Sequence, residues 1–376
     1  MKRLFALFLA VLLIFGMAAC GGKGKAAEAG AAGGGAKPIV GLSLQNMDTT
    51  LAVALYDRFA ERLGNDYDVQ VASADNDPNK QISQIENFIT MGVKMIVTMP
   101  IEMSGLAGAC RKAVDAGVLV YSVGADPREP GVVTHMTLLN QYLTAQYCME
   151  MAKDWIERTF PDAPDNSVEL AIFADSSVPE LIERINAFHQ IKEPYLKNLN
   201  GDYVNYKNEV VPESQKVANP IYCSKVKLLP DIEAPFLQSG ITAMQNLLVS
   251  NPNVRVIIGT NTNSAMGASQ AVMDDYNKGA GAVIKDLSKI AGFGVTVMET
   301  EEQALFDSAK GDGIIRGAIA FGGSDLVGLV VDYVRGILDD PVKAPKIDWI
   351  EISRVTVKDG KRVDEVLPKE GTPQPK

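Results

Sequence analysis

Two short polar stretches carry the side chains best suited to contact a small molecule: SLQNMDTT at residues 43–50 and GTNTNS at residues 259–264. In each, an apolar run typical of a buried strand gives way to amide, hydroxyl and carboxyl groups, and helical periodicity follows at once. The candidate contacts are Gln45, Asn46, Asp48 and Thr49 in the first stretch and Asn261, Thr262 and Asn263 in the second. One or two side chains of the second stretch should cap the helix that follows it. The others suit hydrogen bonding to a polar ligand, unless the whole stretch serves only to cap and turn the chain.

Both stretches belong to a regular alternation of strand and helix patterns. The predicted strands span residues 39–44, 69–74, 95–100, 118–123, 132–136, 168–174, 254–260, 290–295 and 314–321. Helical patterns separate them, one opened by Asp77-Pro78 and another covering residues 178–196. The strands are continuous apolar runs, which is typical of parallel strands covered on both faces. The sequence therefore predicts an α/β fold of two doubly wound parallel-sheet lobes, with ligands at the carboxyl ends of the strands.

Other residues that could support catalysis lack the partners that catalysis needs. His135 and His189 are the only histidines, and neither has a Cys or a second His at metal-ligand spacing. No serine lies in a Gly-x-Ser-x-Gly elbow. The glycines of residues 292–294 lack the rest of a dinucleotide fingerprint. The sequence therefore predicts a protein that is not an enzyme and has no metal or cofactor.

The charge of the chain bears on its partners. The formal net charge is -10, and removal of Lys2 and Arg3 with a leader would make it -12. Such a chain repels phosphate backbones, so we expect no nucleic-acid partner.

The N-terminus indicates export and anchoring. Lys2 and Arg3 precede 16 apolar residues, a run too short to span a bilayer core of about 30 Å and typical of a signal peptide. The run ends at Met17-Ala18-Ala19-Cys20, which resembles a bacterial lipobox. We therefore expect a signal peptide at 1–19, lipidation of Cys20 and a flexible Gly/Ala-rich tether through residue 37. An ordinary signal peptide with an incidental cysteine is the alternative.

Three cysteines remain after Cys20. They are Cys110, Cys148 and Cys223, an odd number, and we expect no disulfide among them. Cys110 and Cys148 lie in helical patterns, where each suits a small buried apolar position.

Longer segments identify a family. The segment VQVASADNDPNKQISQIENFITMGVKMIVTMP, followed by a helical pattern and DAGVLVYSVGADP, resembles the first lobe of ribose/galactose-type periplasmic binding proteins. TAMQNLLVSNPNVRVIIGTNTNSAMGASQAVMD and KIAGFGVT resemble the second lobe. The resemblance covers about residues 39–341. It implies the periplasmic binding protein-like I fold, in which two lobes joined by three crossovers close on a ligand.

The resemblance also implies boundaries for the two lobes. The crossovers would fall near residues 136–138, 321–323 and 344–347. The first lobe would comprise residues 38–137 and 322–344, and the second lobe residues 138–321 and 345–370.

The resemblance extends to individual ligand positions. Sugar-binding members have Asn at the places of Asn46 and Asn261. The further positions that it assigns to the ligand site are Met99, Gly124, Asp126, Ile182, Gly294 and Phe321. Most charged hydroxyl-binding groups of the family are replaced here, for example by Gly124 and Ile182. We therefore expect a small neutral polar ligand, which could be a sugar, a sugar-like compound or a nucleoside.

The function implied is that of an extracytoplasmic substrate-binding lipoprotein, a monomer that delivers its ligand to the membrane permease of an ABC importer. A lipoprotein that reports to a membrane sensor or chemoreceptor, and a structural surface lipoprotein without a ligand, are the alternatives. Residues 200–237 are longer than the family usually carries. They are either a surface insertion or a cover for the cleft mouth that supplies Tyr203, Tyr206 or Tyr222.

Overall fold

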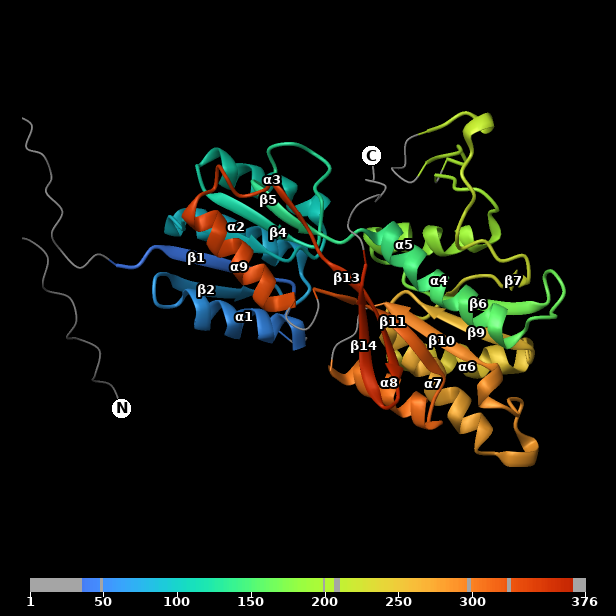
Figure 1. Cartoon of the computed structure of the whole chain (residues 1–376). Coiled ribbons are helices and arrows are strands. Elements are labelled where there is room, and N and C mark those ends of the chain that lie inside the picture. The colour runs from blue at the N-terminus through green and yellow to red at the C-terminus, as the bar shows by residue number, and fades with distance from the viewer. Residues whose placement is uncertain are drawn as a thin grey trace, which may run out of the picture. The chain divides into compact units, whose positions relative to one another are not determined.

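The structure is a computed structural model that describes residues 36–47, 50–198, 200–205, 210–295, 299–322 and 326–367 (Figure 1). The expected signal peptide, the lipidation site Cys20 and most of the tether lie outside these ranges. Asp48, Thr49, Tyr206 and Gly323 lie outside them as well. Within the described residues, no helix is both long and apolar enough to cross a membrane.

The first lobe is built on a six-stranded sheet in which all neighbouring strands run parallel. In spatial order its strands are β12 (Ile347–Trp349), β5 (His135–Leu138), β4 (Leu119–Val123), β3 (Met95–Thr98), β1 (Ile39–Leu44) and β2 (Asp68–Ser73). β1 lies between β3 and the edge strand β2, and Val40 lies opposite both Val69 and Met95.

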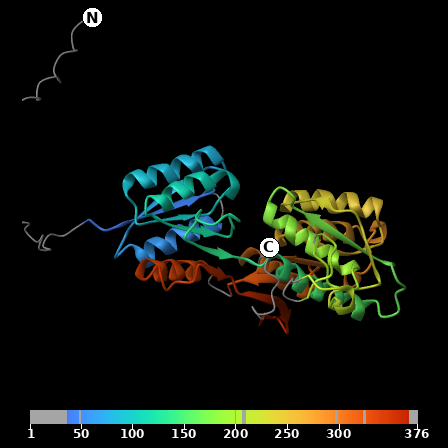
Figure 2. The ribbon, with the colours of Figure 1, turned by 90° about the horizontal axis from the view of Figure 1, so that it is seen from above.

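Helices cover both faces of this sheet, as Figure 2 shows. The helices are α1 (Thr50–Leu63) and α9 (Leu326–Asp339) on one face, and α2 (Pro78–Met91) and α3 (Met103–Asp115) on the other. Phe59 and Val334 are fully buried in the first apolar layer, and Ile85 and Leu106 are buried in the second. Burial on both faces explains why the strand sequences are continuously apolar.

Local capping fixes the start and end of α2. The carboxylate of Asp77 accepts hydrogen bonds from the backbone N–H groups of Asn79 (2.8 Å) and Lys80 (3.3 Å), and Pro78 occupies the first turn. Gly92 ends the helix in the left-handed conformation, at φ +68°. The predicted start of this helix is confirmed.

The second lobe is built on an eight-stranded sheet. Its strands are β6 (Val168–Ala174), β7 (Val226–Leu228), β8 (Ile232–Glu233), β9 (Val254–Gly259), β10 (Ala291–Val295), β11 (Ile315–Phe321), β13 (Ile352–Lys358) and β14 (Lys361–Val366). The spatial order is β14-β13-β11-β10-β9-β6-β7, with β8 beside β6. Neighbouring strands run parallel except for the hairpin β13–β14, which adds an antiparallel edge next to β11.

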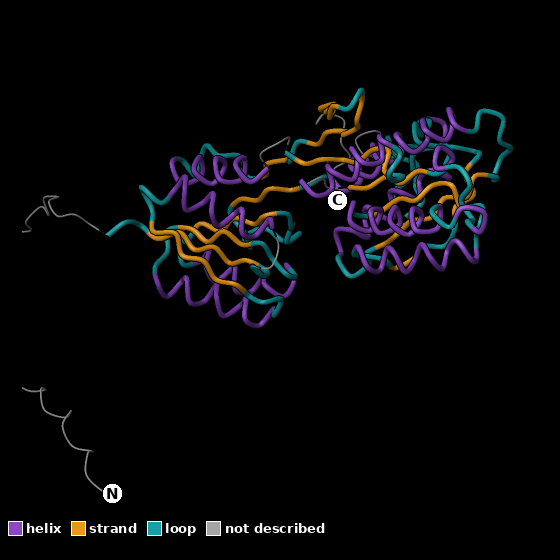
Figure 3. The backbone as a smooth tube through the Cα atoms, turned by 90° about the horizontal axis from the view of Figure 1, so that it is seen from below, coloured by secondary structure: helices purple, strands orange, loops and turns teal. Residues whose placement is uncertain are grey.

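Helices also cover the second sheet on both faces (Figure 3). They are α4 (Gln141–Thr159) and α5 (Pro179–His189) on one face, α6 (Leu237–Ser250) and α7 (Thr262–Tyr276) on the other, and α8 (Glu299–Lys310) beside β11. The predicted helix over 178–196 is shorter in the structure. It ends at His189. Glu193 is extended because a proline, here Pro194, disfavours the helical conformation of the residue before it.

Three chain segments lead from one sheet to the other. They follow β5, β11 and β12, and backbone hydrogen bonds link them: Ile350 N–H donates to Leu138 O (2.9 Å), and Gly322 N–H donates to Glu351 O (2.7 Å). The third crossover differs from the prediction near 344–347. Residues Ile347–Trp349 still pair with β5 of the first sheet, so the chain changes sheet between Trp349 and Ile352.

The three described cysteines are buried free thiols. Burial raises the pKa of Cys110 and of Cys148 to about 12, so both stay protonated at neutral pH. They occupy small apolar positions in the helix layers, as predicted.

Candidate ligand-binding site

The loop after β1 is tied to neighbouring loops by its amide side chains. Gln45 Nε2 donates a hydrogen bond to Pro100 O, which lies after β3. Asn46 Nδ2 donates to Asn76 Oδ1 at 2.9 Å, and Asn76 lies after β2. The two predicted contacts Gln45 and Asn46 therefore lie at the carboxyl edge of the first sheet, where three loops meet.

The other predicted positions of the first lobe that the structure describes lie at the same edge. Met99 follows β3 and is half-buried against the apolar layer of α1 and α9. Gly124 follows β4 at φ +81°, and no atom lies within 4 Å of the position that a Cβ would take, so backbone conformation alone favours glycine there. Asp126 Oδ1 accepts the N–H of Arg128 at 2.8 Å, which stabilises the turn.

Three residues of the GTNTNS stretch in the second lobe have different structural settings. Asn261 caps α7: its Oδ1 accepts the N–H of Ser264 (2.9 Å), and its Nδ2 donates to Pro235 O (2.7 Å). Thr262 is buried, and its hydroxyl donates to Val295 O at 3.1 Å. Asn263 is exposed in the first turn of the helix. Asn261 and Thr262 therefore have roles in the fold itself, and Asn263 is the exposed amide residue of the stretch.

Gly294 lets the sheet and α7 approach closely. A Cβ at Gly294 would lie 2.6 Å from Thr262 Cα and 2.8 Å from Thr262 Oγ1, closer than packed side chains allow. The glycine at this position therefore has a packing role, whatever its relation to a ligand. Ile182 lies on α5 with 42% of its surface exposed.

Arg184 is a buried cation at the carboxyl edge of the second sheet, and the sequence patterns above did not identify it. Its guanidinium donates to Gln141 Oε1 from Nε (2.9 Å) and Nη2 (2.6 Å), and from Nη1 to Thr260 O. Its Cζ lies 6.0 Å from the ring centre of Phe321, the last residue of β11. Burial lowers the pKa of Arg184 to about 9, so the group is charged at neutral pH.

Arg184 joins three elements at the carboxyl edge of the second sheet: the start of α4, the end of β9 and the end of β11. The signal that could have revealed it is its helical spacing. Arg184 precedes the buried Ala187 and Phe188 by three and four positions, so it lies on the apolar face of α5. A cation on such a face requires internal hydrogen-bond partners.

The two histidines lie in structural settings. His135 is buried, with its ring nitrogens near Thr134 Oγ1 (3.0 Å) and Pro341 O (3.2 Å). His189 contacts Asp231 at 2.9 Å. In the part of the chain that the structure describes, no group of three His, Cys, Asp or Glu side chains could hold a metal ion.

The described part of the long segment 200–237 packs against the residues just before it in the second lobe. The rings of Tyr195 and Tyr203 meet edge to face at 6.2 Å, and Lys216 Nζ lies 4.3 Å from the centre of the Tyr195 ring. Isolated β-bridges, such as Val204 with Val210, connect parts of this segment. Tyr203 is therefore engaged within this segment.

Two parallel-sheet α/β lobes, joined by three crossovers and bearing polar groups at their strand ends, have the architecture of bilobal binding proteins. The family model described as "Periplasmic binding protein domain" matches residues 40–320. The chain belongs to this family.

Curated relatives agree with that assignment. The D-apiose import binding protein of Actinobacillus succinogenes is 25% identical over 214 residues, which are 57% of this chain and 57% of that protein. The matched segment thus spans little more than half of that relative. The ribose import binding protein of Escherichia coli is 21% identical over 243 residues, which are 63% of this chain and 68% of the relative.

Solved structures share the fold. A periplasmic ribose ABC transporter protein from Conexibacter woesei superposes with a TM-score of 0.64 at 16% identity, covering 86% of this chain and 94% of that one. An ABC transporter solute binding protein from Bacillus halodurans with bound myo-inositol gives 0.63 at 16% identity, covering 85% and 96%. At these identities the likeness concerns the fold alone.

Proposed function

We propose that this protein is the extracytoplasmic substrate-binding component of an ABC importer and that it captures a small neutral sugar or sugar-like compound. Its family membership over residues 40–320 supports this proposal, and so do relatives named for the import of D-apiose and ribose. The observation that carries it is the gathering of polar groups at the carboxyl ends of both parallel sheets. Binding and release without catalysis is the proposed activity.

The proposed site lies at these two edges. It would comprise Gln45, Asn46, Asp48, Thr49, Met99, Gly124 and Asp126 of the first lobe, and Ile182, Asn261, Thr262, Asn263, Gly294 and Phe321 of the second. Amide groups suit hydroxyls because they donate and accept hydrogen bonds. Asn261 and Thr262 would act mainly by shaping the edge, and Asn263 by direct contact.

The charged groups at these edges favour a neutral ligand. Arg184 donates to Gln141 and Thr260, and Asp126 accepts from the backbone of Arg128. Because these charges already have hydrogen-bond partners, a neutral ligand could bind without displacing them. Arg184 would hold the second-lobe edge in shape.

The cellular setting is also a proposal. Signal cleavage after Ala19 and lipidation of Cys20 would hold a monomeric binding domain beside the membrane, next to a permease. A sensor or chemoreceptor partner would use the same binding domain. Cross-linking in intact cells, followed by identification of the membrane partner, separates the two.

A thermal-shift screen tests the ligand class. The purified protein without its lipid would be heated with neutral monosaccharides, polyols and nucleosides, and with sugar acids and amino acids as comparison sets. A true ligand at 100 times its dissociation constant should stabilise the protein by about 2.7 kcal/mol. We expect hits among the neutral sugars or polyols. Stabilisation only by amino acids or sugar acids would contradict the proposal.

A further inference from the structure

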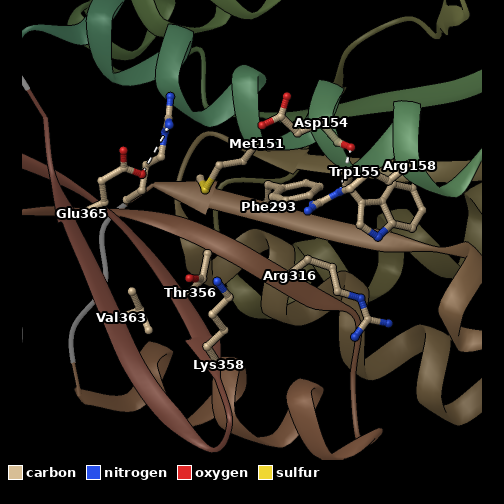
Figure 4. A pocket seen from close by; sticks show the side chains of 11 residues that line it. Met151, Asp154, Trp155, Arg158, Phe293, Arg316, Thr356, Lys358, Val363 and Glu365 are labelled. Carbon is tan, nitrogen blue, oxygen red and sulfur yellow. Dashed lines mark hydrogen bonds and ion pairs between the residues drawn. The ribbon is translucent and has the colours of Figure 1, made fainter.

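A groove in the second lobe lies on the face of the sheet that α4 covers. One wall is the C-terminal half of α4, and the floor is formed by β10, β11, β13 and β14 (Figure 4). The volume of the groove is about 280 Å³. Arg316, which lines it, is near the start of β11, and Phe321 ends that strand. At about 3.3 Å per residue, about 16 Å of strand separate Arg316 from the carboxyl edge, whereas Phe293 lies two residues before the end of β10.

The groove has more positive than negative charge. Four cations and two carboxylates line it. Of the cations, Arg354 is neutralised, because its Nη2 pairs with Glu150 and its Nη1 lies 3.4 Å from Glu365. One of the two lining carboxylates, Glu365, is therefore already engaged.

The other three cations, Arg158, Arg316 and Lys358, have no carboxylate partner among the residues that the structure describes. Arg158 Nε donates to the backbone O of Asp154 at 3.1 Å. Arg316 donates to the carbonyl groups of Ser308 (3.1 Å) and Leu287 (2.6 Å), which are neutral acceptors. These three cationic side chains line one groove in a chain whose formal net charge is -10.

The positive charge of Arg316 is partly removed from water. Its guanidinium is half-buried, and burial lowers its pKa. A partly desolvated cation with only neutral partners gains most from an anion placed beside it.

The apolar part of the groove suits a flat ring. Met151, Trp155 and Phe293 line it, and Figure 4 shows the Trp155 indole beside Arg158 on the α4 wall. An edge-to-face contact with Phe160, at 5.7 Å between ring centres, fixes the indole. A volume of about 280 Å³ lies just below the usual range of small-molecule sites, which suits a ligand of one ring with one charged group.

We propose that this groove is a second ligand site, separate from the sugar site, that binds a small aromatic anion. The anionic group, a carboxylate or a phosphate, lies among Arg158, Arg316 and Lys358, and the ring packs on Met151 and Trp155.

Trp155 provides a direct readout. The chain has two tryptophans, so Trp349→Phe leaves Trp155 as the only tryptophan, whose emission can be excited selectively over that of the tyrosines. This variant would be titrated at constant ionic strength with phenyl phosphate and with benzoate. Inorganic phosphate and neutral benzyl alcohol are the comparison probes. We expect a saturable fluorescence change with at least one aromatic anion, and weaker binding of both comparison probes. Thermal shifts of the protein that retains both tryptophans, with the same probes, provide a measurement independent of Trp349→Phe.

Charge-reversal variants test the location. Arg158→Glu and Lys358→Glu change exposed side chains and should fold normally. Each should weaken anion binding about 10-fold or more, because a charge-assisted contact is lost. Lys310→Glu, an exposed lysine of α8 outside the groove, is the matched control and should bind as before.

Three outcomes would overturn the proposal. One is the absence of saturable binding of either aromatic anion below about 10 mM, by fluorescence and by thermal shift alike. Another is an equal loss of anion affinity in Lys310→Glu and Lys358→Glu, which would indicate an effect of the overall electrostatic field of the protein and not a local contact. The third is an affinity for inorganic phosphate or benzyl alcohol equal to that for the aromatic anions, which would show that binding does not need both a charge and a ring.

Discussion

Replacement of Asn261 by alanine should destabilise the second lobe measurably. The change removes the N-cap of α7, in which Oδ1 accepts the Ser264 N–H at 2.9 Å, and a second hydrogen bond to Pro235 O at 2.7 Å. Loss of the cap costs about 1 kcal/mol, and loss of the second bond about 1 kcal/mol more. The free energy of unfolding should therefore fall by about 2 kcal/mol. For a cooperative unit of about 200 residues this corresponds to a melting temperature lower by about 4 to 8 °C.

Thermal and urea unfolding, followed by circular dichroism without ligand, would measure this change. Asn261→Asp retains the oxygen that accepts from Ser264 but loses the donor to Pro235. Its free energy of unfolding should therefore lie between those of Asn261→Ala and the native protein. Asn263→Ala alters an exposed neighbour and should shift stability by less than about 0.5 kcal/mol. Equal melting of Asn261→Ala and Asn263→Ala would show that the hydrogen bonds of Asn261 do not hold this edge.

Three further predictions concern packing, pH and anchoring. Gly294→Ala should destabilise by about 1 to 3 kcal/mol in urea, because its Cβ would overlap Thr262; unchanged stability would contradict that packing. Burial, helped by the charge of Lys346, lowers the pKa of His135. As the pH falls below about 6.5, the unfolded state takes up this proton first, so stability present above that pH is lost on acidification. His135→Gln should flatten this loss in urea titrations, and an unchanged slope would refute the assignment. Cys20→Ser should move the exported protein from the membrane to the soluble fraction with binding intact, whereas retention on membranes would count against lipidation.

The architecture was largely predictable from local patterns. Apolar runs such as residues 39–44 and 95–98 are strands buried on both faces, and their composition records that environment directly. The Asp77-Pro78 start of α2 is equally local, because a cap bonds to residues two and three positions away. Each feature depends on neighbours close in the sequence.

The details of the site depend on contacts between distant segments. Arg184 bonds to Gln141 and Thr260, which lie 43 and 76 positions away. Asn261 uses its second polar group on Pro235, 26 positions upstream. The third crossover was placed too early because the pairing of β12 with β5 joins segments about 210 residues apart, which periodicity does not reveal. Whether Ile182 and Phe321 touch a ligand remains a prediction.

Hydrogen–deuterium exchange with and without ligand would test most directly that both lobes bind one small molecule. The ligand would be the sugar or polyol that raises the melting temperature most. We expect slower exchange of backbone amides in residues 45–47, 99–101 and 124–126 of the first lobe, and in residues 260–264 of the second. These segments all follow strand carboxyl ends. Protection confined to one lobe, or confined to the second half of α4, would contradict the binding of one small molecule by both lobes.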